Sequence, residues 1–133
     1  MNRFLKISLL IVGVIVIMLG MEVKHRMDIY DQIKQEEIKI AQSKEAIVIY
    51  EQELKWLDPN ALTNEGTIKS YSIDLDSITL NPMGGFSIHL IINDDPDIYL
   101  RVGLGRYDME RNLEIDGIYR SEKLEKLLKG VER

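Results

Sequence analysis

The fold is decided by the stretch FSIHLIINDDPDIYLRVGL, residues 86–104, in which apolar and polar side chains alternate on both sides of a turn signal. A period of two places every second side chain on the same face of a β-strand. The apolar positions predict one strand over Phe86–Ile92 and another over Ile98–Leu104. The segment between them, Asn93–Asp97, contains one proline and three aspartates, which favour a tight connection. An antiparallel hairpin is therefore the centre of the predicted fold.

The same alternation continues on both sides of this hairpin. Further apolar residues alternate with polar ones at Tyr71, Ile73 and Leu75 upstream, and at Leu113 and Ile115, with an extension to Tyr119, downstream. The connecting segments 81–85 and 107–112 are short and hold turn-forming residues. We predict four antiparallel strands in a meander with one apolar face.

A long helix is predicted ahead of the sheet, because residues 28–57 contain no Gly or Pro. Apolar residues recur in it every seven positions, at Ile33, Ile40, Ile47 and Leu54. Its first half has few other apolar residues and indicates a solvated stalk, whereas its second half is expected to pack on the sheet, with Trp56 in the core. The heptad also allows a weak homodimeric coiled coil, although two good turns are few for one.

Two capping signals complete the fold. Asp58-Pro59 is expected to end the long helix, because proline disfavours helical geometry in the preceding residue. Ser121 is expected to cap a final helix, with apolar residues at Leu124, Leu127, Leu128 and Val131. The predicted fold class is α+β, with the long helix across the apolar face of the sheet in a layout similar to that of cystatins. We expect a membrane anchor and flank over residues 1–27, a helical stalk over 28–43 and an α+β domain over 44–133.

The N-terminus predicts a membrane anchor. Residues 7–21 carry no charge. Adding Phe4 and Leu5, beyond a snorkelling Lys6, gives a segment over residues 4–21 that is roughly 27 Å long as a helix, close to the ~30 Å core of a bilayer. Signal-peptide cleavage needs small residues one and three positions before the cut, but the best cut, after Gly20, has Met18 at the third position. We therefore expect an uncleaved single-pass anchor, with a cleaved signal peptide as the alternative.

Orientation is a near tie by the positive-inside rule, since two basic residues lie on each side of the apolar run. The free N-terminal amine and the short segment before the run favour a C-terminal domain outside the cytoplasmic membrane. The chain has no cysteine, which suits the envelope of a Gram-positive bacterium and excludes disulfides, thiolate metal sites and thiol nucleophiles.

Charge and composition argue against several classes of function. The net charge is −5, and because Arg3 and Lys6 supply +2, the part after Met21 carries −7, which disfavours nucleic-acid binding. The aspartates at 94, 95 and 97, and those at 74 and 76, do not have the spacing of a calcium loop. His25 and His89 have no metal or catalytic partner in the sequence. We expect no cofactor, no metal and no enzymatic activity; a hydrolase using Asp74, Asp76 or His89 is the enzyme alternative.

Two places are candidates for binding. The segment 81–85, NPMGG, has the residues of a tight hairpin, but free backbone amides at Met83, Gly84 and Gly85 would also suit a ligand. The second candidate is the strand face that carries Tyr99 and Arg101. The neighbouring GLG at 103–105 has no following helix, which excludes a dinucleotide loop and indicates a strand bend or the close approach of another backbone.

Four strings in the second half of the chain carry a resemblance to a family: LDPNALT at 57–63, GTIKSY at 66–71, DSI at 76–78 and NPMGG at 81–85. Together they resemble the core of an uncharacterised family of Gram-positive bacteria, domain of unknown function thirteen-ten, over about residues 44–128. The resemblance implies an N-terminal membrane segment and a small polar domain, with no established activity, cofactor or catalytic residue. It also implies that the Asp58-Pro59 turn and the 81–85 loop are shared structural features.

The expected function is that of a membrane-tethered, non-enzymatic binding module. Residues 4–21 would contact the lipid bilayer, and the domain would recognise an unidentified protein or envelope component through a sheet edge or the hairpin ends. The alternatives are a membrane-localised immunity or inhibitor protein against a toxin, phage component or protease, and a structural subunit of a membrane complex.

Overall fold

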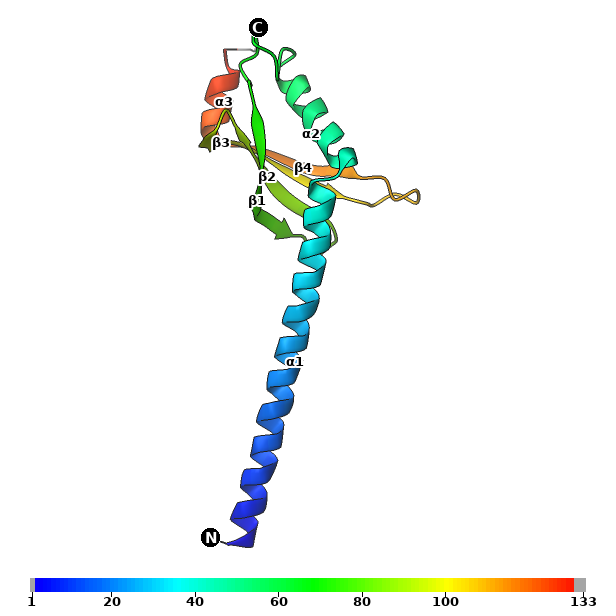
Figure 1. Cartoon of the computed structure of the whole chain (residues 1–133), viewed down its shortest axis with the longest axis vertical. Helices are drawn as coiled ribbons and strands as arrows, with labels where there is room; N and C mark the ends of the chain where they lie inside the picture. The colour runs from blue at the N-terminus through cyan, green and yellow to red at the C-terminus, as the bar shows by residue number, and fades with distance from the viewer. Residues whose placement is uncertain (1, 131–133) are drawn as a thin grey trace. The chain divides into compact units, whose positions relative to one another are not determined.

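A computed structural model describes residues 2–130 of the chain, which divides into two compact units after Gln35 (Figure 1). The elements are α1 (Arg3–Ala41), α2 (Lys44–Leu57), β1 (Tyr71–Leu80), β2 (Phe86–Ile92), β3 (Asp95–Gly105), β4 (Glu114–Arg120) and α3 (Glu122–Leu128). Val131 of the predicted final helix, and the last residues of the predicted domain, lie outside the described residues.

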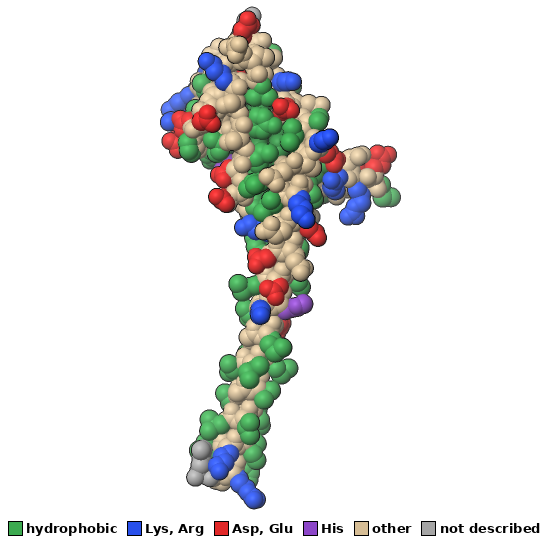
Figure 2. All heavy atoms as spheres, in the orientation of Figure 1, with side chains coloured by type: hydrophobic (Ala, Val, Ile, Leu, Met, Phe, Trp, Pro, Cys, Tyr) green, Lys and Arg blue, Asp and Glu red, His purple; other side chains and the backbone are tan. Residues whose placement is uncertain are grey.

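The first unit is the N-terminal part of α1. Its apolar side chains are exposed along the helix, with Phe4 and Met18 exposed by 81% and 65% (Figure 2). Such a surface is unfavourable in water, and α1 is the one helix among the described residues that is long and apolar enough to cross a membrane. The expected membrane-spanning segment is thus present as a continuous helix.

The second unit, residues 36–133, contains the sheet, which has the predicted meander order β1-β2-β3-β4 with every neighbouring pair antiparallel. One face of the sheet is apolar and buried. It packs against α2 and α3 in a single core whose fully buried side chains include Tyr50, Leu54, Phe86, Ile88, Leu90, Leu100, Val102 and Leu124. The α+β class and the arrangement of helix against sheet are confirmed.

The expected single helix over residues 28–57 is interrupted between Ala41 and Lys44. Ser43 has extended backbone angles, its Oγ accepts a hydrogen bond from the amide of Ala46 at 3.2 Å, and it donates to the carbonyl of Ile40 at 2.6 Å. The buried Tyr50 hydroxyl donates to the carbonyl of Ala41 at 3.0 Å, and burial raises the pKa of Tyr50. The break is stable because side chains take up the hydrogen-bonding groups that a helix end leaves unpaired.

Replacing Ser43 by alanine is expected to lower the free energy of unfolding by about 1 kcal/mol, because the first turn of α2 loses its cap. Thermal unfolding followed by circular dichroism would show a lower melting temperature than in Ser72→Ala, which changes an exposed serine of β1. Equal melting temperatures for the two variants would contradict a capping role.

The position predicted for Trp56 in the core is wrong, because its side chain is 73% exposed. The buried face of α2 is formed by Ala46, Tyr50 and Leu54, four residues apart. At about 100° per residue, Trp56 lies about 200° around the helix from Leu54 and therefore faces away from the core.

Strand ends also differ from the sequence pattern. The β2–β3 connection is a two-residue turn of Asn93 and Asp94, both with positive φ (54° and 58°), so β3 begins at Asp95 rather than Ile98. The Asn93 side chain stabilises this turn by accepting hydrogen bonds from the amides of Lys69 at 2.8 Å and Ser70 at 3.2 Å. β1 continues to Leu80 through an irregularity in its pairing with β2.

Both predicted caps are present. α2 ends at Leu57, and the Asp58 side chain that follows is only 2% exposed. Ser121 caps α3 by accepting from the amide of Leu124 at 3.2 Å, and it also accepts from the amide of Tyr99 at 3.0 Å. The second bond ties the cap of α3 to β3.

Candidate functional site

The 81–85 loop forms a closed hairpin turn. The amide of Gly84 donates to the carbonyl of Asn81 at 2.9 Å, and the amide of Met83 donates to the Asn81 side chain at 3.1 Å. The backbone amide of Asn81 donates to the carbonyl of Gly85 at 3.0 Å. Two of the three amides proposed for ligand binding are therefore used inside the loop, while the Met83 side chain is 87% exposed.

Tyr107 connects this loop to β4. Its hydroxyl donates to the carboxylate of Asp116 and lies 3.0 Å from the carbonyl of Gly84, and the hydrogen bond to Asp116 raises the pKa of Tyr107 to about 12. A Cβ atom on Gly105 would lie 2.3 Å from the Tyr107 ring. Gly103 is approached in the same way by the Asp116 side chain. The two glycines of β3, Gly103 and Gly105, thus leave room for side chains rather than for another backbone.

The outer face of the sheet, opposite the core, carries a cluster of aromatic and basic side chains that we call the outer-face patch: His89, Tyr99, Arg101 and Tyr119. His89 of β2 stacks on Tyr99 of β3 with ring centroids 4.4 Å apart and planes 10° apart. Tyr99 lies 6.3 Å from Tyr119 of β4. Arg101 is paired in register with both His89 and Tyr119, so three strands contribute to the patch.

The patch is largely uncharged apart from Arg101. Burial lowers the pKa of His89, the neighbouring Arg101 lowers it further, and Asp74 opposes both effects. An imidazole stacked on a tyrosine gives a flat, half-buried surface. Tyr99 and Arg101 were predicted from the sequence; His89 and Tyr119 were not assigned to the same site, because only the strand register brings them there.

A hollow of about 270 Å³ opens beside the patch. Gly103 and Gly117 are paired across β3 and β4 in its floor and carry no side chains of their own, while the Asp116 carboxylate lies over Gly103. Its remaining lining consists of Ser87, Arg101, Asp116, Ile118 and Tyr119. Asp116 reaches the hollow because the β3–β4 pairing shifts register at this point, which turns an additional residue toward the outer face.

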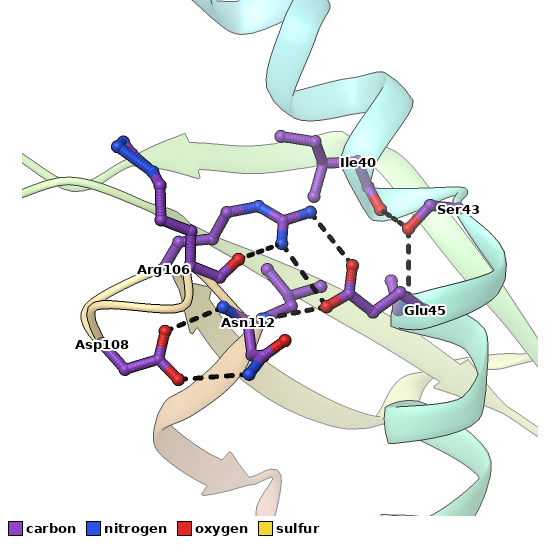
Figure 3. A network of polar contacts seen from close by, with 9 residues as sticks. Ile40, Ser43, Glu45, Arg106, Asp108 and Asn112 are labelled. Atoms are coloured by element: carbon purple, nitrogen blue, oxygen red, sulfur yellow. Dashed lines mark hydrogen bonds and ion pairs between the residues drawn. The ribbon is translucent and has the colours of Figure 1, made fainter.

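The loop between β3 and β4 is tied to the start of α2 (Figure 3). Glu45 accepts hydrogen bonds from the amide of Leu113 at 2.8 Å and from Arg106 at 3.1 Å, and Arg106 also donates to the carbonyl of Arg111 at 2.6 Å. The bond from Leu113 is the main cause of the lowered pKa of Glu45, followed by the bond from Arg106. These contacts hold the loop in place.

Replacing Glu45 by glutamine is expected to make stability less dependent on pH. The folded-state pKa lies below the ordinary value of 4.5, so the ionised carboxylate contributes stability that is complete above that value and is lost as pH falls through the folded pKa. Glu45→Gln should therefore melt below the unchanged protein at pH 7, with the difference shrinking as pH falls below 4.5 and through the folded-state pKa. A difference that persisted at acid pH would contradict this assignment.

The other acidic and histidine candidates lie in ion pairs or at exposed positions. The Lys123 ammonium lies 3.6 Å from both Asp95 and Asp97, which neutralises part of the acidic turn. Asp76 is exposed at the surface, and His25 lies in the exposed part of α1. Within residues 2–130, no group of three His, Asp or Glu side chains is placed to hold a metal ion.

Comparison with known proteins gives one family. The family described as "Protein of unknown function (DUF1310)" matches residues 7–127, which includes most of the apolar helix and the whole sheet. No curated protein and no solved structure matches the chain.

Proposed function

The chain belongs to the DUF1310 family of proteins of unknown function, and we propose that it is a single-pass membrane protein that displays a non-enzymatic binding domain outside the cytoplasmic membrane. The apolar part of α1 supports the membrane attachment. The binding role rests on the outer-face patch, and the side of the membrane rests on the sequence arguments about flanking charge and length.

One observation carries the binding role: an exposed face of a well-packed sheet presents Tyr99 beside a hollow that Arg101 and Tyr119 line. Tyrosine and arginine are enriched in the residues that dominate binding energy, because they offer large contact areas and directional hydrogen bonds. The sheet fixes their positions in advance, which reduces the entropy lost on binding. We favour this patch over the 81–85 loop, where the internal hydrogen bonds already occupy the amides of Met83 and Gly84.

The side of the membrane is tested with the cysteine-free chain itself. A single Glu110→Cys substitution places a thiol in the exposed β3–β4 loop. Treatment of intact cells with a membrane-impermeant maleimide should label this variant. Labelling that required cell lysis would place the domain in the cytoplasm and contradict the proposed orientation.

The binding role is tested by photo-crosslinking in cells. A photoreactive amino acid at Tyr119 should capture a discrete ligand, whereas the same group at Ser72, exposed on β1, should not. Adding Arg101→Ala should reduce capture from position 119. Equal capture at both positions, or capture unaffected by Arg101→Ala, would contradict the assignment of this face. Capture of a toxin or phage protein would identify the domain as an immunity or inhibitor protein.

A further inference from the structure

The hollow beside Tyr119 has the chemistry of a carbohydrate subsite. We propose that it binds one ring of a neutral glycan, an assignment that rests on the binding role of the outer-face patch. Three features carry it: the size and floor of the hollow, its combination of charges, and the orientation of its aromatic wall.

The hollow suits a small flat group. Its volume of about 270 Å³ lies just below the ~300–1,000 Å³ of pockets that enclose drug-sized ligands. Gly103 and Gly117 form part of the floor without side chains, and a Cβ atom added to Gly117 would meet no atom within 4 Å. A single sugar ring could therefore approach the β4 backbone at Gly117, beside the Asp116 carboxylate that covers Gly103.

The polar lining favours a neutral ligand with many hydroxyl groups. Arg101 offers only donors, the Asp116 carboxylate offers only acceptors, and the Ser87 hydroxyl offers both. The opposite charges of Arg101 and Asp116 offset one another for an anionic or a cationic ligand, so a net charge on the ligand gains little. A sugar hydroxyl donates and accepts at the same time, so a ring bearing several of them satisfies both side chains without placing a net charge in the hollow.

Asp116 is also held in a defined position. Tyr107 donates to its Oδ2 atom, and its Oδ1 atom lies over Gly103 at the floor of the hollow. A carboxylate fixed in this way can accept from a ligand hydroxyl with little further loss of side-chain entropy. The 81–85 loop contributes indirectly, since the Tyr107 hydroxyl also lies beside the carbonyl of Gly84.

The aromatic wall is exposed and lies beside a second aromatic ring. Tyr119 is 57% exposed and lies 6.3 Å from Tyr99, which is itself stacked on His89. The face of an aromatic ring is negative, and the C–H groups of a sugar ring carry partial positive charge, so the two stack. Tyr119 thus has an aromatic neighbour on one side and keeps an exposed surface.

The test uses the full chain in lipid nanodiscs, because maltoside detergents would themselves present glucose rings. The probes are the trimer of N-acetylglucosamine and the glucose trimer maltotriose. Their binding is measured by saturation-transfer NMR and calorimetry. At least one should bind with a Kd on the order of 1 mM. Tyr119→Ala and Gly117→Val should each weaken that binding by roughly tenfold, the first by removing the wall and the second by filling the hollow.

Gly117→Val is the sharper variant because its added Cβ enters open space and valine is favourable in strands. Ser72→Val on β1 is the matched control and should leave binding unchanged. The glycan assignment would be overturned if neither trimer bound at a concentration of about 10 mM, on the order of ten times that Kd. It would also be overturned if binding were insensitive to both substitutions. If neither trimer binds, but a protein is captured from position 119 and this capture is lost in Gly117→Val, the ligand is a protein and the binding role stands. If neither glycan binding nor protein capture is found, the glycan assignment and the binding role both fail.

Discussion

Replacing Asp58 by alanine is expected to lower the free energy of unfolding by about 3 kcal/mol or more. The side chain is 2% exposed, and its carboxylate accepts from the amides of Asn60 at 3.1 Å, Thr67 at 2.8 Å and Ile68 at 3.0 Å. Alanine would leave these donors without their acceptor, and the amide of Ile68 belongs to a fully buried residue. The chain between α2 and β1 would lose the group that organises it.

The measurement is thermal or urea unfolding of the full chain by circular dichroism, with Asp76→Ala as the matched control on the exposed side of β1. Asp58→Asn should fall between the two, since the amide keeps one oxygen acceptor but turns two N–H groups toward backbone donors. A loss for Asp58→Ala within about 0.5 kcal/mol of the control, the usual range for surface changes, would contradict this role.

Gly85→Ala is the second substitution with a large expected effect, a loss of about 3 kcal/mol in the free energy of unfolding. Gly85 has φ of +82°, and an added Cβ atom would lie 2.3 Å from the carbonyl oxygen of Leu104 in β3. The clash is with the backbone of the neighbouring strand, so a change of side-chain rotamer cannot relieve it. Separation of the β2 and β3 ends is the expected consequence.

Gly84→Ala is the matched control, because Gly84 also has a positive φ, +103°, but has open space around an added Cβ atom. It should cost about 1 kcal/mol from backbone conformation alone. Comparing the melting curves of the two variants separates conformational strain from the clash. Equal losses would show that the contact with Leu104 contributes little.

Local signals in the sequence were sufficient for most of the fold. Strand alternation depends on residues two apart, and it located all four strands, although β1 continues to Leu80, beyond the predicted Leu75. The caps at Ser121 and Asp58 follow from residue types whose preferences act over three or four positions. The turn at Asn93 was shorter than predicted because its side chain is held by the amides of Lys69 and Ser70, which are distant in sequence.

The candidate site was accessible to sequence reasoning only in part. Alternation placed Tyr99 and Arg101 on the face opposite the core. It could not associate them with Tyr119 or Asp116, because that requires the exact partner of each residue across β3 and β4, including the register shift. Alternation within β2 put His89 on the same outer face, but its stacking on Tyr99 depends on the pairing of β2 with β3.

The sequence by itself determined the apolar N-terminal helix, the four-stranded meander and its buried face, because each depends on periodic burial along a short segment. Only the tertiary structure decided that the expected long helix breaks at Ser43, that Trp56 faces outward and that Gly103 and Gly117 meet to form a hollow. The hollow depends on the pairing of β3 with β4, and local preference contains no information about which residues will meet across two strands. The break at Ser43 and the outward position of Trp56 depend on which face of α2 packs on the sheet, and the bond from Tyr50 to the carbonyl of Ala41 forms only once that face is buried.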